Sequence, residues 1–207
     1  MRQCQGPAAA RKPPAFYNFA CVNVEQAVRT RRTVKAFRPD PVDRETLTEL
    51  LELARWAPNH HLTNPWRFRV VGPRSLEALK RAAAELALED APKEADGGQV
   101  AEVAAAKLDR APTLVVCSAT QSGDAQQDEE DRNAAGCAAY IVLLAAHARG
   151  LAGYWRTPAV LRSAPGRAAV ELPDDEAFVG LIHLGSARQA AEPPEREPPE
   201  HYVRFLG

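Results

Sequence analysis

The stretch NAAGCAAYIVLLAAHAR, Asn133–Arg149, decides the fold class because it predicts one long helix that is apolar on nearly every side. A helix without a polar face is normally buried, so we expect it at the centre of the domain. Gly150 follows at the position where a left-handed glycine commonly ends a helix. Cys137 in this helix and Cys117 in a neighbouring apolar run are both expected to be small buried residues rather than catalytic thiols.

Working outward from this helix, three segments are predicted strands. Residues 66–71 alternate large apolar and basic side chains at period two, whereas 112–119 and 178–185 are continuous apolar runs. Further helices are predicted over 24–32, from an N-cap at Asp43 to about Trp56, and from an N-cap at Ser75 to about Glu89. The polar segments 89–99 and 121–133 are predicted loops, the second leading into the first turn of a helix. This order predicts an α/β or α+β domain.

Length and charge narrow the function classes. The 207 residues fit one domain, 21–207, preceded by an extension over 1–20 that is rich in Pro, Ala and Arg. A net charge of −1 argues against nucleic acid and anionic membranes as partners. No apolar run is long enough to span a bilayer, and no secretory signal is recognisable, so we expect a cytoplasmic protein.

Several common nucleotide and metal motifs are absent from the sequence. No GxGxxG follows a strand and no GxxxxGK[ST] is present, which disfavours a Rossmann domain or a P-loop. None of the four cysteines stands in CxxC spacing, and the five histidines have no metal-ligand spacing, so no metal site is expected.

The segment RTRRTVKAF, Arg29–Phe37, is the first candidate site. Arg31, Arg32 and Thr33 would point in different directions on a regular helix, but they can converge where the helix ends and the chain bends. Guanidinium groups beside a hydroxyl are suited to holding a phosphate. The alternative is a basic helix C-terminus that simply complements the helix dipole.

Three other segments carry polar and aromatic groups. Residues 55–71, RWAPNHHLTNPWRFRVV, either form a turn with solvent-facing histidines or lay polar groups along a ring-shaped ligand. Residues 150–161, GLAGYWRTPAVL, either form a helix stop with aromatic packing or present a flat surface and backbone donors to a ligand. The Pro-rich tail holds Arg196 and Arg204, and it is either a solvated arm, an arm draped over a neighbour, or a source of phosphate ligands.

Taken together and in this order, four motifs resemble the FMN-dependent nitroreductase family, and most closely its small YdjA-type branch. The motifs are RRTVKAF, APNHHLTNPWRF, AAGCAAYIVLLAAHARGLAGYWRT and FVGLIHLG, and the resemblance runs from about Val24 to the tail. It implies an α+β, nitroreductase-like fold with a central mixed sheet wrapped by helices. It also implies a homodimer with two FMN sites in the interface.

The resemblance places FMN against three parts of the chain. The end of the first helix would bind the phosphate and ribityl chain, and Lys35 would stabilise negative charge at the pyrimidine edge of the reduced flavin. The loop after the second helix would line the cofactor, and the end of the buried helix would flank ring and phosphate. The implied cofactor contacts are Arg31, Arg32, Thr33, Lys35, Trp56, His60, Asn64, Trp155, Arg156 and Thr157.

Several positions depart from the family pattern. Trp56 stands where YdjA-type relatives carry an arginine, and Leu62 stands where many relatives have an amide. Asn64 replaces a glutamine. Pro158, which has no N–H, replaces a glycine, so a backbone donor to flavin N5 would have to come from Thr157.

The implied activity is that of an FMN-dependent NAD(P)H oxidoreductase. NADH or NADPH would reduce the flavin, and a nitro compound, quinone or other electron-poor small molecule would then reoxidise it in a ping-pong cycle. No side chain is needed as a nucleophile, so no catalytic residue is assigned. Two alternatives stay open: another flavin reaction on this fold, such as a dehydrogenase, dehalogenase or flavin-modifying enzyme, and a non-enzymatic binding module that uses the basic RTRR segment.

Overall fold

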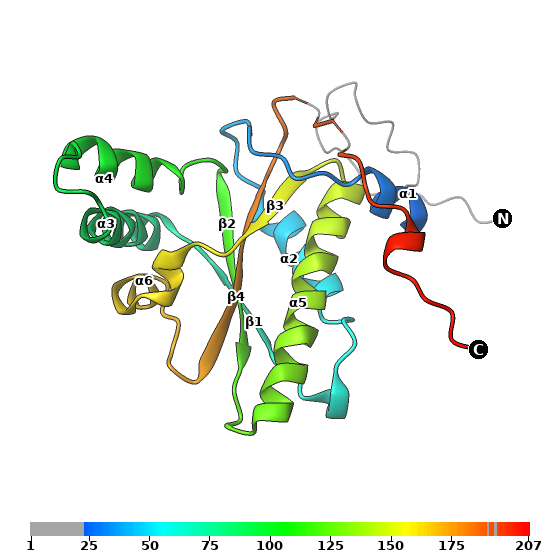
Figure 1. Cartoon of the computed structure of the whole chain (residues 1–207). Helices are drawn as coiled ribbons and strands as arrows, with labels where there is room; N and C mark the ends of the chain where they lie inside the picture. The colour runs from blue at the N-terminus through cyan, green and yellow to red at the C-terminus, as the bar shows by residue number, and fades with distance from the viewer. Residues whose placement is uncertain (1–22, 190, 193) are drawn as a thin grey trace.

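The computed structural model describes residues 23–207 except 190 and 193, so the predicted extension over 1–20 lies outside the described residues. The chain alternates helices with four strands around one central sheet (Figure 1). In chain order the elements are α1 (Val24–Thr30), α2 (Arg44–Ala54), η1 (His60–Leu62), β1 (Trp66–Val70), α3 (Pro73–Glu89), α4 (Gly97–Ala106), β2 (Thr113–Thr120), α5 (Ala125–Ala148), β3 (Ala152–Arg156), η2 (Ala159–Arg162), α6 (Ala164–Ala169), β4 (Glu176–Gly185) and η3 (Pro199–His201).

The sheet has the strand order β1-β2-β4-β3, and all three pairings between these strands are antiparallel. A parallel bridge joins Thr33 to Gly153 beside the outer strand β3. The sequence predicted a mixed sheet. Among the described residues, this bridge is its only parallel pairing. It ties the segment after α1 to the start of β3, and so brings two of the sequence-predicted site segments together.

The first face of the sheet is covered by α5 and α2 (Figure 1). The helix that we expected at the centre does lie there, because Ala135, Ala138 and Val142 are fully buried against alternate residues of β2 and β4. However, α5 is not buried on every side. Cys137 is exposed on its outer face, contrary to the prediction, because the sheet and α2 cover only part of the helix circumference.

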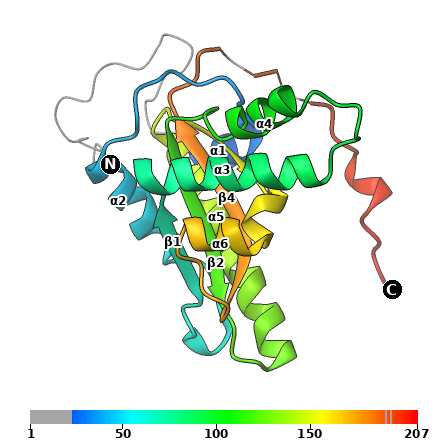
Figure 2. The same cartoon turned by 90° about the vertical axis from the view of Figure 1, so that its left-hand side faces the viewer.

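The second face is covered by α3, α4 and α6, which lie in front of the sheet in Figure 2. Leu79 of α3 and Leu161 of η2 are fully buried against the inward side chains of β2 and β4. Buried strands that have helices on both faces explain why residues 113–120 and 178–185 are continuously apolar instead of alternating.

Four details of the secondary structure were predicted wrongly or missed. The helix α3 begins at Pro73, two residues before Ser75, and its N-cap is Gly72 rather than Ser75. The predicted loop over 89–99 ends inside α4, whose N-cap Asp96 accepts a hydrogen bond from the Gln99 N–H. Most of the predicted loop over 121–133 is the start of α5, which begins at Ala125. The segment 152–156 is a strand rather than a turn.

Within the part of the chain that the structure describes, none of the helices is long and apolar enough to cross a membrane. The same residues contain no cluster of three or more His, Cys, Asp or Glu side chains that could hold a metal ion.

Candidate functional site

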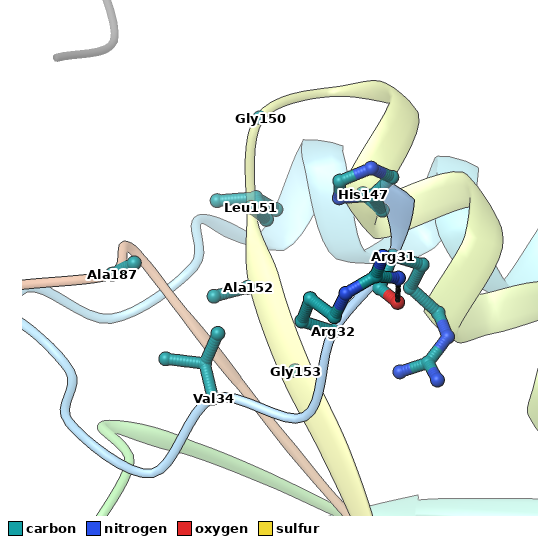
Figure 3. A pocket seen from close by; sticks show the side chains of 9 residues that line it. All are labelled: Arg31, Arg32, Val34, His147, Gly150, Leu151, Ala152, Gly153 and Ala187. Atoms are coloured by element: carbon teal, nitrogen blue, oxygen red, sulfur yellow. Dashed lines mark hydrogen bonds between the residues drawn. The ribbon is translucent and has the colours of Figure 1, made fainter. Parts of the chain in front are cut away.

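The two arginines after α1 line a small hollow at the C-terminal end of α5 (Figure 3). The remaining lining comes from His147, from the turn into β3, and from Val34 and Ala187. The full set is Arg31, Arg32, Val34, His147, Gly150, Leu151, Ala152, Gly153 and Ala187. The helix ends here because Arg31 leaves helical geometry, with φ −59° and ψ 130°. Both arginine side chains therefore start where the helix stops, and both line the hollow.

Arg31 and Arg32 have different surroundings in this hollow. The Arg31 Nε is buried and has no hydrogen-bond partner among the described residues, and its guanidinium carbon lies 5.8 Å from the centre of the Tyr140 ring. Arg32 donates from Nη1 to the Arg31 carbonyl at 2.8 Å, as the dashed line in Figure 3 marks. A buried cationic donor without a partner is costly, so this hollow is suited to an anion. We call it the arginine corner, after Arg31 and Arg32.

His147 belongs to this corner, although the sequence pattern did not single it out. Its Nε2 lies 2.8 Å from the Thr30 hydroxyl, which ties the end of α1 to the last turn of α5. Burial, followed by the charges of Arg31 and Arg32, lowers the pKa of His147 below its ordinary value. The ring is therefore neutral at neutral pH and adds no charge to the corner.

Thr33 and Lys35 extend the basic segment along β3. Val34 between them is buried, whereas both neighbours are exposed, which is the alternation of an extended chain. The Thr33 and Lys35 side chains therefore lie on the same outer side of this segment. Arg31 and Arg32 line the hollow, whereas Thr33 and Lys35 follow on the exposed side of the same segment.

The loop 59–64 has an unusual and well-anchored backbone. His61, Leu62 and Asn64 all have positive φ angles, of 53°, 53° and 47°. The Asn59 Oδ1 accepts a hydrogen bond from the Asn64 N–H at 3.0 Å, and the Asn64 side chain donates to the Leu62 carbonyl at 2.7 Å. The Asn64 amide is therefore engaged within the loop. Left-handed residues other than glycine are uncommon and often mark functional loops.

Two side chains of the first turns of α5 hold this loop. Thr63 donates from its hydroxyl to the buried carboxylate of Asp131 at 2.5 Å, and the His60 Nδ1 lies 2.6 Å from the Glu130 carboxylate. Nothing in the sequence pointed to a role for Glu130. It lies in an acidic run that resembles any solvated helix start, and it is seventy residues from His60. The hydrogen bonds from His60 and then Gln126 lower the pKa of Glu130.

The arginine corner and the loop 59–64 lie at opposite ends of α5 (Figure 1). His147 marks one end and Glu130 the other, and at about 1.5 Å per residue these positions are about 25 Å apart along the helix axis. Within a single protomer the structure therefore does not bring His60 and Asn64 together with Arg31 and Arg32.

The residues predicted from the end of the buried helix do not share one face. Trp155 packs between α5 and β4, and its indole N–H donates to the Val179 carbonyl at 3.2 Å. Arg156 points to the other side of the sheet and donates to the Lys107 carbonyl at 3.2 Å. Successive strand residues point to opposite faces, so both cannot flank the same ring. Thr157 is exposed immediately after the strand.

Two further candidates from the sequence are Trp56, a predicted cofactor contact, and the tail, which has no single predicted role. Trp56 is 74% exposed after α2, with the Arg55 guanidinium 5.7 Å from its ring centre. Arg55 itself pairs with Glu52 at 3.0 Å. In the tail, Phe205 and Leu206 are 94% and 86% exposed, and Arg196 is exposed as well. Neither segment contacts the arginine corner through a described hydrogen bond.

Known proteins resemble this chain over most of its length. The sequence profile described as "Nitroreductase family" matches residues 28–186. YfhC of Bacillus subtilis (strain 168), provisionally named an NAD(P)H nitroreductase, is 26% identical over 172 residues, which are 83% of this chain and 88% of YfhC. The 5,6-dimethylbenzimidazole synthase of Rhodospirillum rubrum is 35% identical over 180 residues, which are 81% of this chain and 83% of the synthase.

A solved structure shows the same fold. The FMN and NADPH-dependent nitroreductase NfnB from Sphigopyxis sp. strain HMH superposes with a TM-score of 0.72 at 20% identity, covering 89% of this chain and 99% of NfnB. At this level of identity the likeness concerns the fold alone.

Proposed function

From the premise that this chain belongs to the nitroreductase family, we propose that it is an FMN-dependent oxidoreductase that uses NADH or NADPH to reduce an electron-poor small molecule. The observation that carries the proposal is the arginine corner. There, Arg31 and Arg32 converge at a helix end, and the buried Arg31 Nε has no partner in the described part of the chain. An FMN phosphate is a group that would satisfy these donors.

The chain's own residues have limited and definable roles in this proposal. Bound FMN supplies the redox chemistry, because it can take a hydride from NADH or NADPH and later return it to a nitro compound, a quinone or another acceptor. Arg31, Arg32 and Thr33 hold the phosphate and ribityl chain. Lys35, exposed on the same outer side as Thr33, places a positive charge where the reduced ring carries negative charge.

We also propose a homodimer in which each FMN site takes the arginine corner from one protomer and the loop 59–64 from its partner. The separation of about 25 Å between these parts along α5 supports this arrangement. Large apolar side chains are exposed on α1, beside the loop and in the tail, including Val24, Leu62 and Phe205 at 79%, 77% and 94%. These side chains lie on three separate segments, and in this proposal the second copy covers them.

The geometry favours fewer cofactor contacts than the family resemblance implies. In this proposal one protomer contributes Arg31, Arg32, Thr33 and Lys35, and its partner contributes His60, Asn64 and Trp56. Thr157 keeps its proposed role as a backbone donor, since it is exposed after β3. Trp155 and Arg156 are better explained by packing and by the contact to Lys107. The cytoplasm, where NAD(P)H is available, stays the proposed location.

Two measurements test the proposal. The purified protein should be yellow or should take up added FMN, with absorbance in the flavin band, and a protein that binds no flavin would overturn it. Stopped-flow mixing with NADH and NADPH should then bleach the flavin, and a nitroaromatic or quinone should restore the colour. A flavin that neither nicotinamide reduces would exclude the NAD(P)H-driven reaction but keep the flavin site.

The 35% identity to a 5,6-dimethylbenzimidazole synthase favours a second candidate, a reaction in which the flavin itself is modified. The mass spectrum of the flavin recovered after turnover separates the two. Intact FMN after many cycles supports the reductase, whereas consumption of FMN together with formation of 5,6-dimethylbenzimidazole supports the synthase-like reaction.

A further inference from the structure

His60 and Glu130 form a close pair between the loop 59–64 and α5. The imidazole Nδ1 lies 2.6 Å from the Glu130 Oε2, within hydrogen-bond reach. With Nδ1 turned to the carboxylate, Nε2 points away from α5, and the side chain is 59% exposed. A carboxylate on one nitrogen of a histidine orients the ring and favours a proton on it.

The ring is also held by its own loop. His61 stacks on His60 with ring centres 3.7 Å apart and an angle of 21° between the planes. Three left-handed residues shape the loop, and Thr63 anchors it to Asp131 one position after Glu130. Such a backbone is not needed for a simple surface turn, and it fixes the direction of His60 relative to α5.

The charged groups around His60 come from three sources. Glu130 and the buried Asp131 face it from α5, and Asp131 is occupied by the Thr63 hydroxyl. His61 lies against it in the loop, and Arg67 at the start of β1 donates to the Asn64 carbonyl at 2.8 Å. Among the residues that the structure describes, Glu130 alone makes a hydrogen bond with the His60 ring, so it is the group whose removal should change how the ring is held.

We propose that His60 is a catalytic proton donor in the reduction of the acceptor, and that Glu130 is the positioning residue that keeps its ring oriented. The proposal rests on the proposed function, because the loop reaches an acceptor only in a site shared with a partner's arginine corner. It also goes beyond the assignment of His60 as a cofactor contact, because it gives Nε2 a chemical step.

The proposed step conserves atoms and electrons for both acceptors. A nitro group takes up one hydride and one proton, one N–O bond breaks, and the products are a nitroso compound and water. A quinone takes up the same hydride and proton and becomes a hydroquinone. The hydride comes from the reduced flavin, and the proton comes from the His60 Nε2, which is then reprotonated from solvent.

The first experiment compares acceptors on the flavin-loaded dimer after anaerobic reduction with NADPH. 4-Nitrobenzoate and menadione require a proton, whereas ferricyanide takes only electrons. In His60→Gln we expect the rate constant of flavin reoxidation by the first two to fall about 100-fold more than that by ferricyanide. The matched control is His201→Gln, because His201 has the same Nδ1 contact, 2.6 Å to Glu197, in the tail.

The Glu130 variants give a readout that a merely structural role would not move. In Glu130→Gln we expect the rate of 4-nitrobenzoate reduction to fall more than the rate with ferricyanide, because the His60 ring loses the carboxylate that orients it. Glu130→Asp should restore much of the parent rate. Equal rates of 4-nitrobenzoate reduction in Glu130→Gln and parent would overturn the role of Glu130.

The imidazole NMR spectrum adds a measurement independent of turnover. Glu130→Gln should shift the ring nitrogen signals of His60 and leave those of His201 unchanged, and equal His60 signals in parent and variant would contradict the contact between His60 and Glu130. Equal rates of 4-nitrobenzoate reduction in His60→Gln and parent would remove His60 as the donor while keeping the flavin function. A protein that binds no flavin would overturn both proposals, and if His60→Gln alone loses FMN, the rate of 4-nitrobenzoate reduction in Glu130→Gln decides.

Discussion

Arg69 and Glu176 form a two-bond ion pair that connects β1 with β4 across β2. The Nη1 and Nη2 atoms of Arg69 lie 2.7 and 2.8 Å from the two carboxylate oxygens, and the Ser118 hydroxyl donates to the same carboxylate at 2.5 Å. These three residues stand on β1, β2 and β4, so one carboxylate connects three strands. Burial opposes the charge on Glu176, yet the bonds from Arg69 and Ser118 outweigh it and lower its pKa.

The first prediction concerns acid stability. Because the folded-state pKa of Glu176 is lowered, its stabilising contribution is present above the unfolded-state pKa and is lost as pH falls through the folded-state pKa. Glu176→Gln should lower the free energy of unfolding by about 2 kcal/mol at pH 7, and the deficit should shrink below about pH 4. Urea unfolding at both pH values measures this, and a deficit that does not change with pH would contradict the assignment.

The second prediction tests the position of Trp155. A Cβ at Gly180 would overlap the indole ring, whereas a Cβ at Gly136 would lie 3.6 Å from its edge, at an ordinary contact distance. Gly180→Ala should therefore destabilise the fold by about 3 kcal/mol, and Gly136→Ala should be neutral or slightly stabilising, because alanine suits a helix better. Thermal unfolding compares them. Equal stability of both variants would show that Trp155 does not lie over Gly180.

The third prediction addresses the arginine corner. Arg31→Ala should lose bound FMN, because it removes the buried donor next to the phosphate position, whereas Arg29→Ala should keep it. Arg29 is the matched control, since it lies on the same helix but is exposed and paired with Glu25 at 2.9 Å. Flavin absorbance after desalting measures occupancy. A protein that never binds flavin but loses a macromolecular partner in Arg31→Ala would instead support a binding module.

The fourth prediction distinguishes shared from separate sites. A protomer with Arg31→Ala and a partner with Asn59→Ala plus His60→Ala each lack one half of a site. If each site draws on two copies, mixed dimers regain one intact site, and about one FMN per dimer returns. Co-purification with two affinity tags and flavin quantification test this. No regained flavin in mixed dimers would place both halves in one protomer.

The fifth prediction concerns the reactivity of Cys117. Cys117 is fully buried, and burial raises the pKa of its thiol to about 12. In the native protein at pH 8 we expect iodoacetamide to leave Cys117 unmodified, because the thiolate is the reactive form and is scarce there. Peptide mapping by mass spectrometry after labelling, with and without urea, measures the difference. Rapid labelling of Cys117 in the native state would contradict its burial.

The main architecture followed from the sequence because it depends on apolar patterning. The buried helix and the strands at Trp66, Thr113 and Phe178 lie where the hydrophobic runs placed them. The errors occurred where local pattern and tertiary context disagree. The two glycines that open α4 look like a loop, and Cys137 lies on the one side of an apolar helix that the described chain leaves uncovered.

The candidate site was less predictable because its contacts are distant in sequence. Arg31, Arg32 and Thr33 could be grouped from one short motif. The pairing of His60 with Glu130, and of Thr30 with His147, joins residues 70 and 117 positions apart, which no local pattern reveals. Trp155 and Arg156 are neighbours in sequence, but the alternation of a strand that we had taken for a turn sends them to opposite faces.

The position of two half-sites at opposite ends of one helix has a thermodynamic consequence. If each flavin is held by two protomers at once, cofactor binding and subunit association share a single free energy, so each strengthens the other. Flavin occupancy would then depend on protein concentration, and dilution would release FMN even when free FMN is constant. Conversely, added FMN would raise the melting temperature most at low protein concentration, where unliganded protomers are dissociated.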